Sequence, residues 1–424
     1  MNTYLIVNII GVLVFLGIAF LFSKDHKNVN WRSVAIVLVL NLVIAFLLTN
    51  FSLGRDIVKG AASGFQWLVN ISYTGIAFAF PDWVHVKQMN FFTSALLPIL
   101  MIVPLFDILT YFGILPFCIK WIGRGMAFVT GQPKFESFYA VEMMFLGNTE
   151  AMAVSSVQLK HISSKRVLTI AMMSMSCITA AIVGAYAQMV PGQYVLTAIP
   201  LNILNAVIIT NILNPVKVAK AEDKIYEVGD LGGSQEADHQ VAEETVADKP
   251  EKPHREPFFS FLGDSILNAG KLILIIVANV IAFVALAALI SKLLGLINPW
   301  LSLEHILGII MFPFAWLMGL DVSHAFQFAQ YMGTKLITNE FVVMGQVAPH
   351  INNPHLFSAH YRAELTVFLT SFANVSTVGM IIGCLKGLVN REKNDMISKN
   401  VGYLFLSGIL VSLMSAGIVG IFVW

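Results

Sequence analysis

The stretch GTKLITNEFVV at residues 333–343 places a carboxylate, Glu340, inside a largely apolar run. A carboxylate at the centre of a membrane helix costs roughly 2.5–3.5 kcal/mol on insertion scales. The whole chain is similarly apolar: of its 424 residues, 57% are hydrophobic and 12% are charged, whereas a soluble domain carries about 25% charged residues. This composition predicts a polytopic membrane protein, in which an ionisable group at membrane depth indicates function.

Hydropathy predicts eight membrane-spanning helices, because a bilayer core of about 30 Å needs roughly 20 apolar residues per helix. If both termini are outside the cell, the short loops that carry most lysines and arginines all lie on the same side of the membrane. Loops rich in these residues are usually cytoplasmic. We therefore expect a multi-pass protein of the cytoplasmic (inner) membrane with both termini extracytoplasmic. The expected spans are 4–22, 33–50, 92–113, 168–190, 194–213, 266–291, 365–385 and 401–423.

Several function classes are excluded by what the sequence contains. The net charge of +1 argues against nucleic acid as a partner. Cys118, Cys177 and Cys384 lie in apolar segments without the spacing of a metal site, so we expect neither a metal nor a cofactor. The chain has no HExxH or GxSxG motif, so an intramembrane enzyme is not expected. A channel would not need the pair of acidic segments described next.

Two regions of the sequence follow the same order of segments. Region 92–213 has a span, an aromatic stretch, a short polar segment at 134–158 and a Ser/Thr-rich span, and it ends with the fifth span. Region 258–390 repeats the first four of these, with its short segment at 323–349. The charge bias starts the first region outside and the second inside, which predicts the inverted repeat of a secondary transporter.

Each short segment is too short to cross the membrane twice, so we expect a re-entrant hairpin buried in protein. The predicted fold class is therefore an all-α polytopic membrane protein with eight transmembrane helices, two opposed re-entrant hairpins and helices broken at the midplane. The remaining segments are scaffold helices with an interfacial stretch (1–91, amphipathic at 52–72), an acidic linker expected to be disordered and cytoplasmic (214–257), and a last span (391–424).

The two hairpin tips carry matching carboxylates. Gly147-Asn-Thr-Glu150 forms the first tip, and Thr338-Asn-Glu-Phe341 forms the second. Glu340 alone could be a structural partner of Lys335, and Asn374 alone could be a hydrogen bond between helices. Two carboxylates at equivalent places of a repeat favour binding of a polar solute at membrane depth.

These residues resemble the motifs of the concentrative nucleoside transporter family, and the resemblance runs from the first span to the last. The family pattern G-x-K-x-x-x-N-E-F is present as Gly333, Lys335, Asn339, Glu340 and Phe341. The family's G-Q-[ST]-E of the first hairpin is GNTE at 147–150, and its F-A-N-x-S-S is FANVST at 372–377.

The resemblance implies a homotrimer that imports nucleosides by an elevator-like alternating-access mechanism, as a secondary active symporter. By this resemblance, Glu340, Asn374 and Thr377 bind the ribose hydroxyls. The base would be contacted at its polar edge and its flat face by Asn148, Thr149, Glu150, Phe372 and Ile182. A carboxylate can accept charge-assisted hydrogen bonds from both hydroxyls of a ribose diol.

Two departures from the family alter the expected pocket. Asn148 replaces a glutamine and Thr377 replaces a serine, so the preference for pyrimidine or purine stays open. A transporter of the same fold for nucleobases or modified nucleosides also stays open.

Further departures concern the coupling ion. Sodium-coupled relatives use two side-chain oxygens at positions that are Met143 and Cys177 here. Thioether and thiol groups are poor ligands for hard cations. We therefore expect proton coupling, with Glu150 favoured over Glu340 as the proton carrier, and we keep sodium coupling as the alternative. The four positions of the altered sodium site are Met143, Leu146, Cys177 and Ile178.

Overall fold

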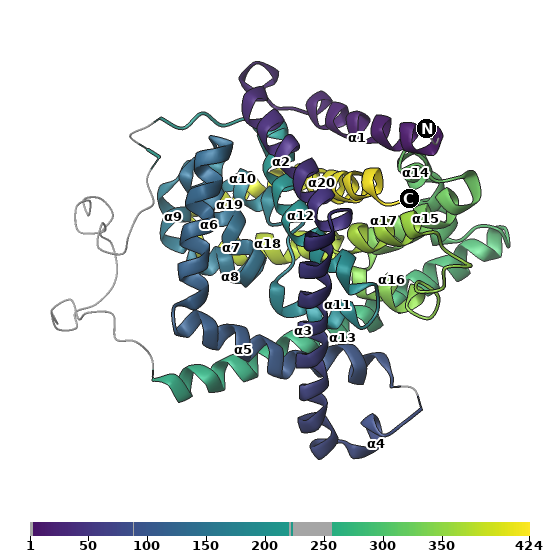
Figure 1. Ribbon diagram of the computed structural model, residues 1–424. Helices are drawn as coiled ribbons and strands as arrows, with labels where there is room; N and C mark the ends of the chain where they lie inside the picture. The colour runs from purple at the N-terminus through teal and green to yellow at the C-terminus, as the bar shows by residue number, and fades with distance from the viewer. Residues whose placement is uncertain (1–2, 88, 220–221, 224–256) are drawn as a thin grey trace.

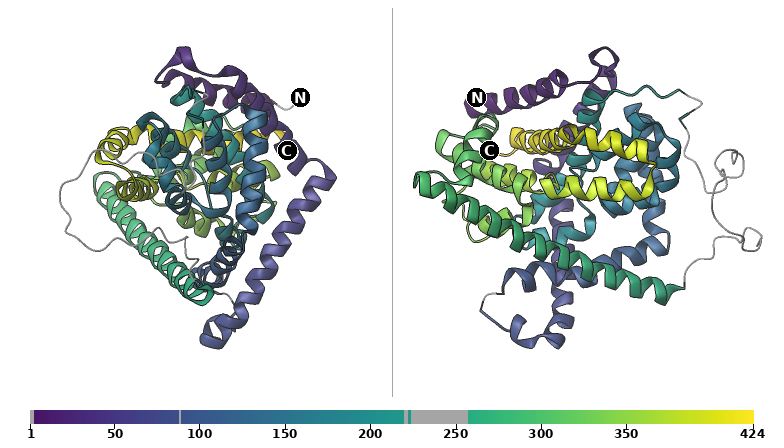
Figure 2. Two further views of the ribbon diagram at one scale, coloured as in Figure 1. Left: turned by 90° about the vertical axis from the view of Figure 1, so that its left-hand side faces the viewer. Right: turned by 180° about the vertical axis from the view of Figure 1, so that it is seen from behind.

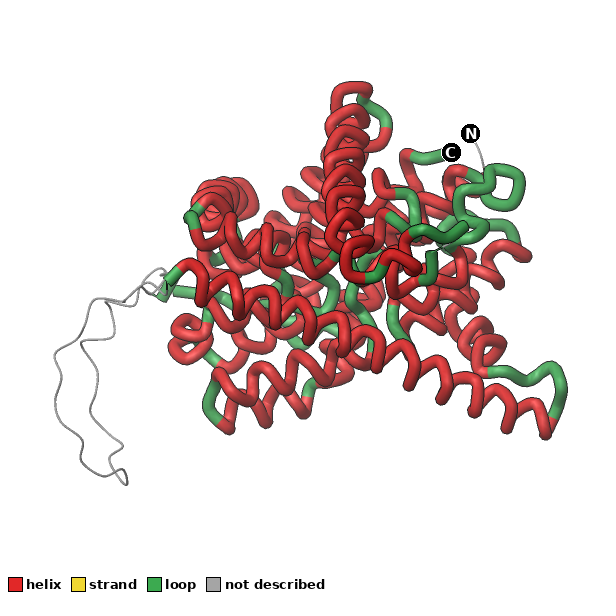
Figure 3. Tube along the Cα trace, turned by 90° about the horizontal axis from the view of Figure 1, so that it is seen from below, coloured by secondary structure: helices red, strands yellow, loops and turns green. Residues whose placement is uncertain are grey.

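The computed structural model describes residues 3–87, 89–219, 222–223 and 257–424, and every regular element in these ranges is helical (Figures 1 and 3). Six helical stretches are long and apolar enough to cross a membrane, which confirms the predicted helical membrane architecture. They are α1 (Thr3–Leu21), α2 (Trp31–Thr49), η2 with α5 (Phe92–Leu96 and Ile99–Tyr111), α12 (Gly192–Leu213), α13 (Phe258–Ile297) and α20 (Val401–Phe422).

The other two predicted spans are interrupted. The first consists of α10 (Ser164–Met173), an irregular stretch, η3 (Ala180–Ile182) and α11 (Val183–Ala187). The second consists of α17 (Ala359–Leu369) and α18 (Val375–Leu388). The total of eight spans therefore stays a prediction, whereas the helix breaks are present.

Polar side chains at the breaks replace missing helical hydrogen bonds. Asn374 precedes α18, and its Oδ1 accepts from the backbone N of Thr377 at 2.9 Å. Thr179 precedes η3, and its hydroxyl oxygen accepts from the backbone N of Ala181 at 3.3 Å. Such caps satisfy the free N–H groups that every helix start leaves.

Two helical hairpins lie beside the breaks. In the first, α7 (Lys134–Leu146) packs against α8 (Asn148–Val154), and in the second, α15 (Val322–Ile337) packs against α16 (Glu340–Val347). Gly147 joins α7 to α8 with φ 84°, a backbone conformation that glycine adopts without strain. A Cβ atom at this position would lie 3.1 Å from Cβ of Thr179, so the tip packs closely on the broken span.

The order of elements repeats along the chain. A membrane-spanning stretch, a second helix, a hairpin and a broken span occur first as η2 with α5, α6 (Ile114–Thr130), α7 with α8, and α10 with α11. They occur again as α13, α14 (Leu303–Trp316), α15 with α16, and α17 with α18. In Figure 1, the first hairpin lies to the left and the second to the right. This arrangement brings the two tips toward the centre of the molecule.

Both chain ends lie on the right of Figure 1, opposite the start of α13. The predicted extracytoplasmic position of both termini stays a prediction. The predicted linker lies mostly outside the described residues. Its described part docks on the first hairpin, because Oδ1 of Asp223 accepts from the backbone N of Lys134 at 2.7 Å.

Two long helices lie on the outside of the bundle (Figure 2). α3 (Ser52–Ala79) extends beyond the amphipathic stretch that the sequence indicates, and it exposes Trp67 and Phe78. α13 exposes a row of leucines and isoleucines and is longer than the predicted span. Exposed apolar faces of this kind are expected against lipid or another subunit. The remaining short helices are η1 (His26–Asn28), α4 (Pro81–Val84), α9 (Ser156–His161) and α19 (Arg391–Lys399).

Candidate functional site

A cavity of about 120 Å³ lies between the two hairpin tips. Its walls come from α8, η3, α13, α16 and α18, which are far apart in the sequence. All eight residues expected to bind substrate line this one cavity: Asn148, Thr149, Glu150, Ile182, Glu340, Phe372, Asn374 and Thr377. The structure thus brings them together, and their individual roles stay predictions.

Glu340 is the first residue of α16, and its side chain is held from two sides. The hydroxyl of Tyr186 donates to Oε1 at 2.9 Å, and Nδ2 of Asn374 donates to Oε2 at 3.1 Å. Both partners are donors, an arrangement that suits an ionised carboxylate. The start of α16 adds the positive end of a helix dipole. Because each carboxylate oxygen has a second lone pair, the group can still accept from a ligand.

Asn374 and Thr377 complete this side of the cavity. Oδ1 of Asn374 lies 3.1 Å from the hydroxyl of Thr377, which also donates to the carbonyl oxygen of Phe372. Asn374 therefore caps α18 with its oxygen while its nitrogen orients Glu340. Asn374 therefore does more than link two helices, because its hydrogen bond also orients the carboxylate of Glu340 beside the cavity.

The first hairpin contributes the opposite wall. Oδ1 of Asn148 accepts from the backbone N of Thr149 at 2.8 Å. The hydroxyl of Thr179 donates to the carbonyl oxygen of Phe145 at 3.0 Å and ties the broken span to the hairpin. Glu150 lines the cavity with its side chain exposed on the isolated chain, whereas Glu340 is buried.

Lys335 does not act as the close partner of Glu340. Its ammonium group donates to the carbonyl oxygen of Phe368 at 3.1 Å and lies 3.4 Å from Oγ of Ser412. The carbonyl belongs to the last turn of α17, where a helix leaves carbonyls without partners. Lys335 therefore stabilises the break in the span.

The remaining motif residues have packing roles. A Cβ atom at Gly333 would lie 2.3 Å from Cβ of Leu307, so α15 and α14 can approach only with glycine there. Phe341 packs edge-on against Tyr186, with ring centroids 5.0 Å apart. Asn339 caps α16 by accepting from the backbone N of Val342 at 3.1 Å.

The four positions where the resemblance predicts an altered sodium site are buried. Met143, Leu146, Cys177 and Ile178 are all enclosed by the protein. Sγ of Cys177 donates to the carbonyl oxygen of Met173 at 3.4 Å, within its own segment. Met143 and Cys177 contain sulfur and Leu146 and Ile178 are hydrocarbon, so none of the four offers a side-chain oxygen.

Sequence reasoning missed two contributions to the site. Tyr186 was not singled out, because a tyrosine in an apolar span gives no sign that it meets a carboxylate 154 positions away. The wall formed by α13 was also missed, although Asn279 is the one polar residue in the run 272–290. Its position in the sequence could have indicated a polar cavity.

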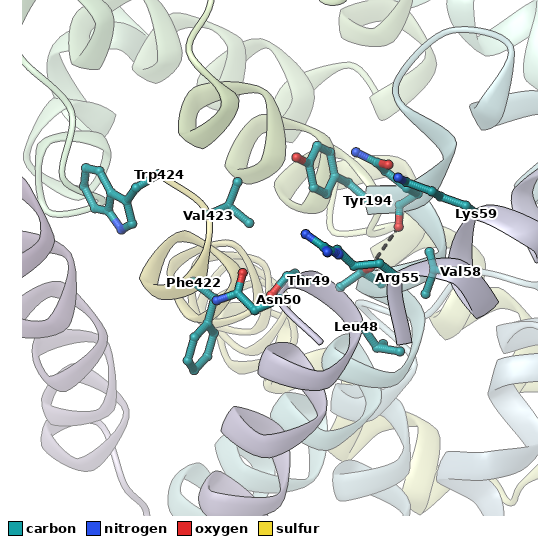
Figure 4. Close-up of a pocket in the computed structure, with 12 residues that line it drawn as sticks. Leu48, Thr49, Asn50, Arg55, Val58, Lys59, Tyr194, Phe422, Val423 and Trp424 are labelled. Carbon is teal, nitrogen blue, oxygen red and sulfur yellow. Dashed lines mark hydrogen bonds between the residues drawn. The ribbon is translucent and has the colours of Figure 1, made fainter. Parts of the chain in front are cut away.

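A second cavity, of about 270 Å³, lies at the ends of α2, α3 and α20 (Figure 4). Arg55, Lys59, Tyr194 and Trp424 are among its lining residues. It contains none of the residues that the sequence singled out, so the cavity between the hairpin tips is the candidate site.

Comparison with known families agrees with this geometry. The family model described as "Na+ dependent nucleoside transporter C-terminus" matches residues 194–420, and its N-terminal counterpart matches residues 10–83. The chain belongs to the concentrative nucleoside transporter family. It is thus a membrane-spanning nucleoside transporter of that family, and the resemblance predicted from its motifs is confirmed.

Relatives match the chain over nearly its whole length. The "Purine nucleoside transport protein NupG" of Bacillus subtilis is 43% identical, and the match covers 99% of this chain and 100% of that protein. The "Nucleoside permease NupC" of Helicobacter pylori is 28% identical, with 98% and 97% covered. A solved structure of CNTnw in an inward-facing substrate-bound state shares the fold, with a TM-score of 0.86, 24% identity and coverage of 99% and 98%.

Proposed function

We propose that this transporter is a proton-coupled symporter that imports nucleosides, with purine nucleosides as preferred substrates. The observation that carries the proposal is the enclosed carboxylate of Glu340, oriented by two donors in a cavity that both hairpins line. The 43% identical relative from Bacillus subtilis, named as a purine nucleoside transport protein, supports the purine preference.

The sugar would bind at the second hairpin. The carboxylate of Glu340 would accept hydrogen bonds from the ribose diol. Asn374 orients this carboxylate, and Asn374 and Thr377 would also contact the ribose hydroxyls. Charge-assisted bonds of this kind are stronger than neutral ones. A ligand without the diol would leave a buried carboxylate poorly paired, which is unfavourable.

The base would bind at the first hairpin. Asn148, Thr149 and Glu150 offer amide, hydroxyl and carboxylate groups to its polar edge. Phe372 and Ile182 supply apolar surface to its flat face. Asn148 is shorter than the family's glutamine, which leaves more room for the larger ring system of a purine.

Proton coupling is supported by the chemistry around the first tip. Met143 and Cys177 offer soft sulfur groups where sodium would need oxygen. The carboxylate of Glu340 accepts hydrogen bonds from two side chains, whereas Glu150 lines the cavity and its carboxylate accepts none from the described residues. Glu150 is therefore the better candidate to take up and release a proton.

The cellular setting follows from the same family. We propose a homotrimer in the cytoplasmic membrane that moves its hairpins and broken spans in an elevator-like way. The exposed apolar faces of α3 and α13 support burial against lipid or neighbouring subunits.

Competition for uptake into proteoliposomes tests the substrate proposal. Unlabelled adenosine, guanosine and inosine should compete with labelled adenosine more strongly than uridine or cytidine does. Adenine as a free base should compete weakly, because it lacks the ribose diol. Stronger competition by adenine than by adenosine would contradict a nucleoside substrate and favour a nucleobase.

The variant Glu150→Gln tests the proton carrier. It should retain exchange of labelled for unlabelled adenosine across the membrane and lose accumulation driven by a pH gradient. Accumulation at the wild-type level would rule out Glu150 as the carrier.

A further inference from the structure

Asn279 is an isolated polar residue in the middle of a membrane-spanning helix. From residue 272 to residue 290, α13 contains only apolar side chains apart from this amide. An amide in a hydrocarbon environment is unfavourable unless it is hydrogen-bonded. Such residues therefore bond across helices or face a polar cavity.

Asn279 faces the cavity between the hairpin tips. It lines this cavity together with Leu272, Ile275 and Ile276, which lie on the same face of α13 at helical spacing. Among the described residues, its side-chain amide makes no hydrogen bond with protein. The residue is half-buried, so its amide can bond to a molecule inside the cavity.

The helix that carries Asn279 contacts the second hairpin. α13 starts on the side of the first hairpin in Figure 1 and runs toward the second, and it packs against α16. Asn279 follows Leu272 by two helical turns, a rise of about 10 Å along the helix. Asn279 and Glu340 thus line the same cavity from two helices that pack against each other.

We propose that Asn279 binds the 5′-hydroxyl of the nucleoside sugar and so contributes to substrate specificity. This inference rests on the proposed function. With the diol assigned to Glu340 and the base assigned to the first hairpin, the 5′-hydroxyl is the remaining hydroxyl of the sugar and its remaining hydrogen-bond donor. A primary amide offers a donor and an acceptor, and a hydroxyl group can pair with either.

The test compares adenosine with 5′-deoxyadenosine by calorimetry on the purified full chain. Wild-type protein should bind adenosine about tenfold more tightly, the effect of one net hydrogen bond. Asn279→Leu should weaken adenosine binding about tenfold and bind the two ligands equally. Asn279→Ala should behave in the same way, and it guards against a packing effect of leucine.

Asn268→Leu is the matched control. Asn268 is an exposed amide on the same helix and does not line the cavity. Its replacement should leave the preference for adenosine intact. Asn279→Gln, which keeps an amide, should retain part of the preference.

Two results would overturn this inference alone. Retained discrimination in both Asn279→Leu and Asn279→Ala would show that another group binds the 5′-hydroxyl. Equal weakening of both ligands would show that Asn279 acts on cavity shape only. Failure of the wild-type protein to bind adenosine would overturn the proposed function as well, and it is distinguishable because it occurs without any substitution.

Discussion

Replacing Glu340 with glutamine should disrupt nucleoside binding more than any other isosteric change in the cavity. The carboxylate accepts from Tyr186 at 2.9 Å and from Asn374 at 3.1 Å. In Glu340→Gln, the new amide nitrogen must face one of these two donors in either orientation, and one acceptor for the ribose diol is lost.

The magnitude follows from the bonds that change. A hydrogen bond to a charged group contributes about 1.5–3 kcal/mol, so the dissociation constant for adenosine should rise roughly 10- to 150-fold. Calorimetry on purified protein in detergent measures this constant directly. An unchanged constant would refute the assignment of Glu340 to the sugar.

Glu364→Gln is a matched control for removing a buried carboxylate. Glu364 is fully buried, accepts from Nδ2 of Asn8 at 3.2 Å and lies 3.2 Å from Nε2 of His360. It does not line the cavity. This variant should lower thermal stability and leave adenosine affinity unchanged.

Three further predictions concern the tip, the linker and a helix cap. Gly147→Ala should lower transport and thermal stability, because a φ of 84° disfavours alanine and the added Cβ would lie 3.1 Å from Cβ of Thr179. A variant that takes up adenosine and melts like the wild type would contradict this. Deleting 225–255 should leave uptake intact, because the docked Asp223 is retained; lost uptake at normal membrane expression would contradict it. Burial raises the pKa of Asp321, but hydrogen bonds from Ser323 and His324 outweigh it and lower that pKa to about 2. The stability that these bonds contribute should therefore be present above about pH 4 and lost as the pH falls toward about 2; an Asp321→Ala variant that melts like wild type at about pH 7 would contradict the cap.

Much of the fold could be predicted because hydropathy and charge act locally. Long apolar runs such as 4–22 and 401–423 became continuous helices, since each satisfies its own backbone hydrogen bonds. The breaks were harder to predict from apolar content alone. By hydropathy alone, 168–190 is one continuous span. The break in it is held by a tertiary contact, because the hydroxyl of Thr179 donates to the carbonyl oxygen of Phe145 in the first hairpin.

The candidate site was predictable where a motif concentrates polar residues. Glu340 and Asn374 stand out against apolar neighbours, and both line the cavity. Tyr186 and Asn279 come from separate segments, and their part in the site depends on how those segments pack. A single sequence does not encode that proximity in any local pattern.

The most direct test of the central claim is accumulation of labelled adenosine in proteoliposomes under an imposed pH gradient at constant sodium. An inward proton gradient should drive adenosine above its external concentration, and a protonophore should abolish this accumulation. Accumulation driven by a sodium gradient alone, at symmetric pH and zero membrane potential, would contradict it.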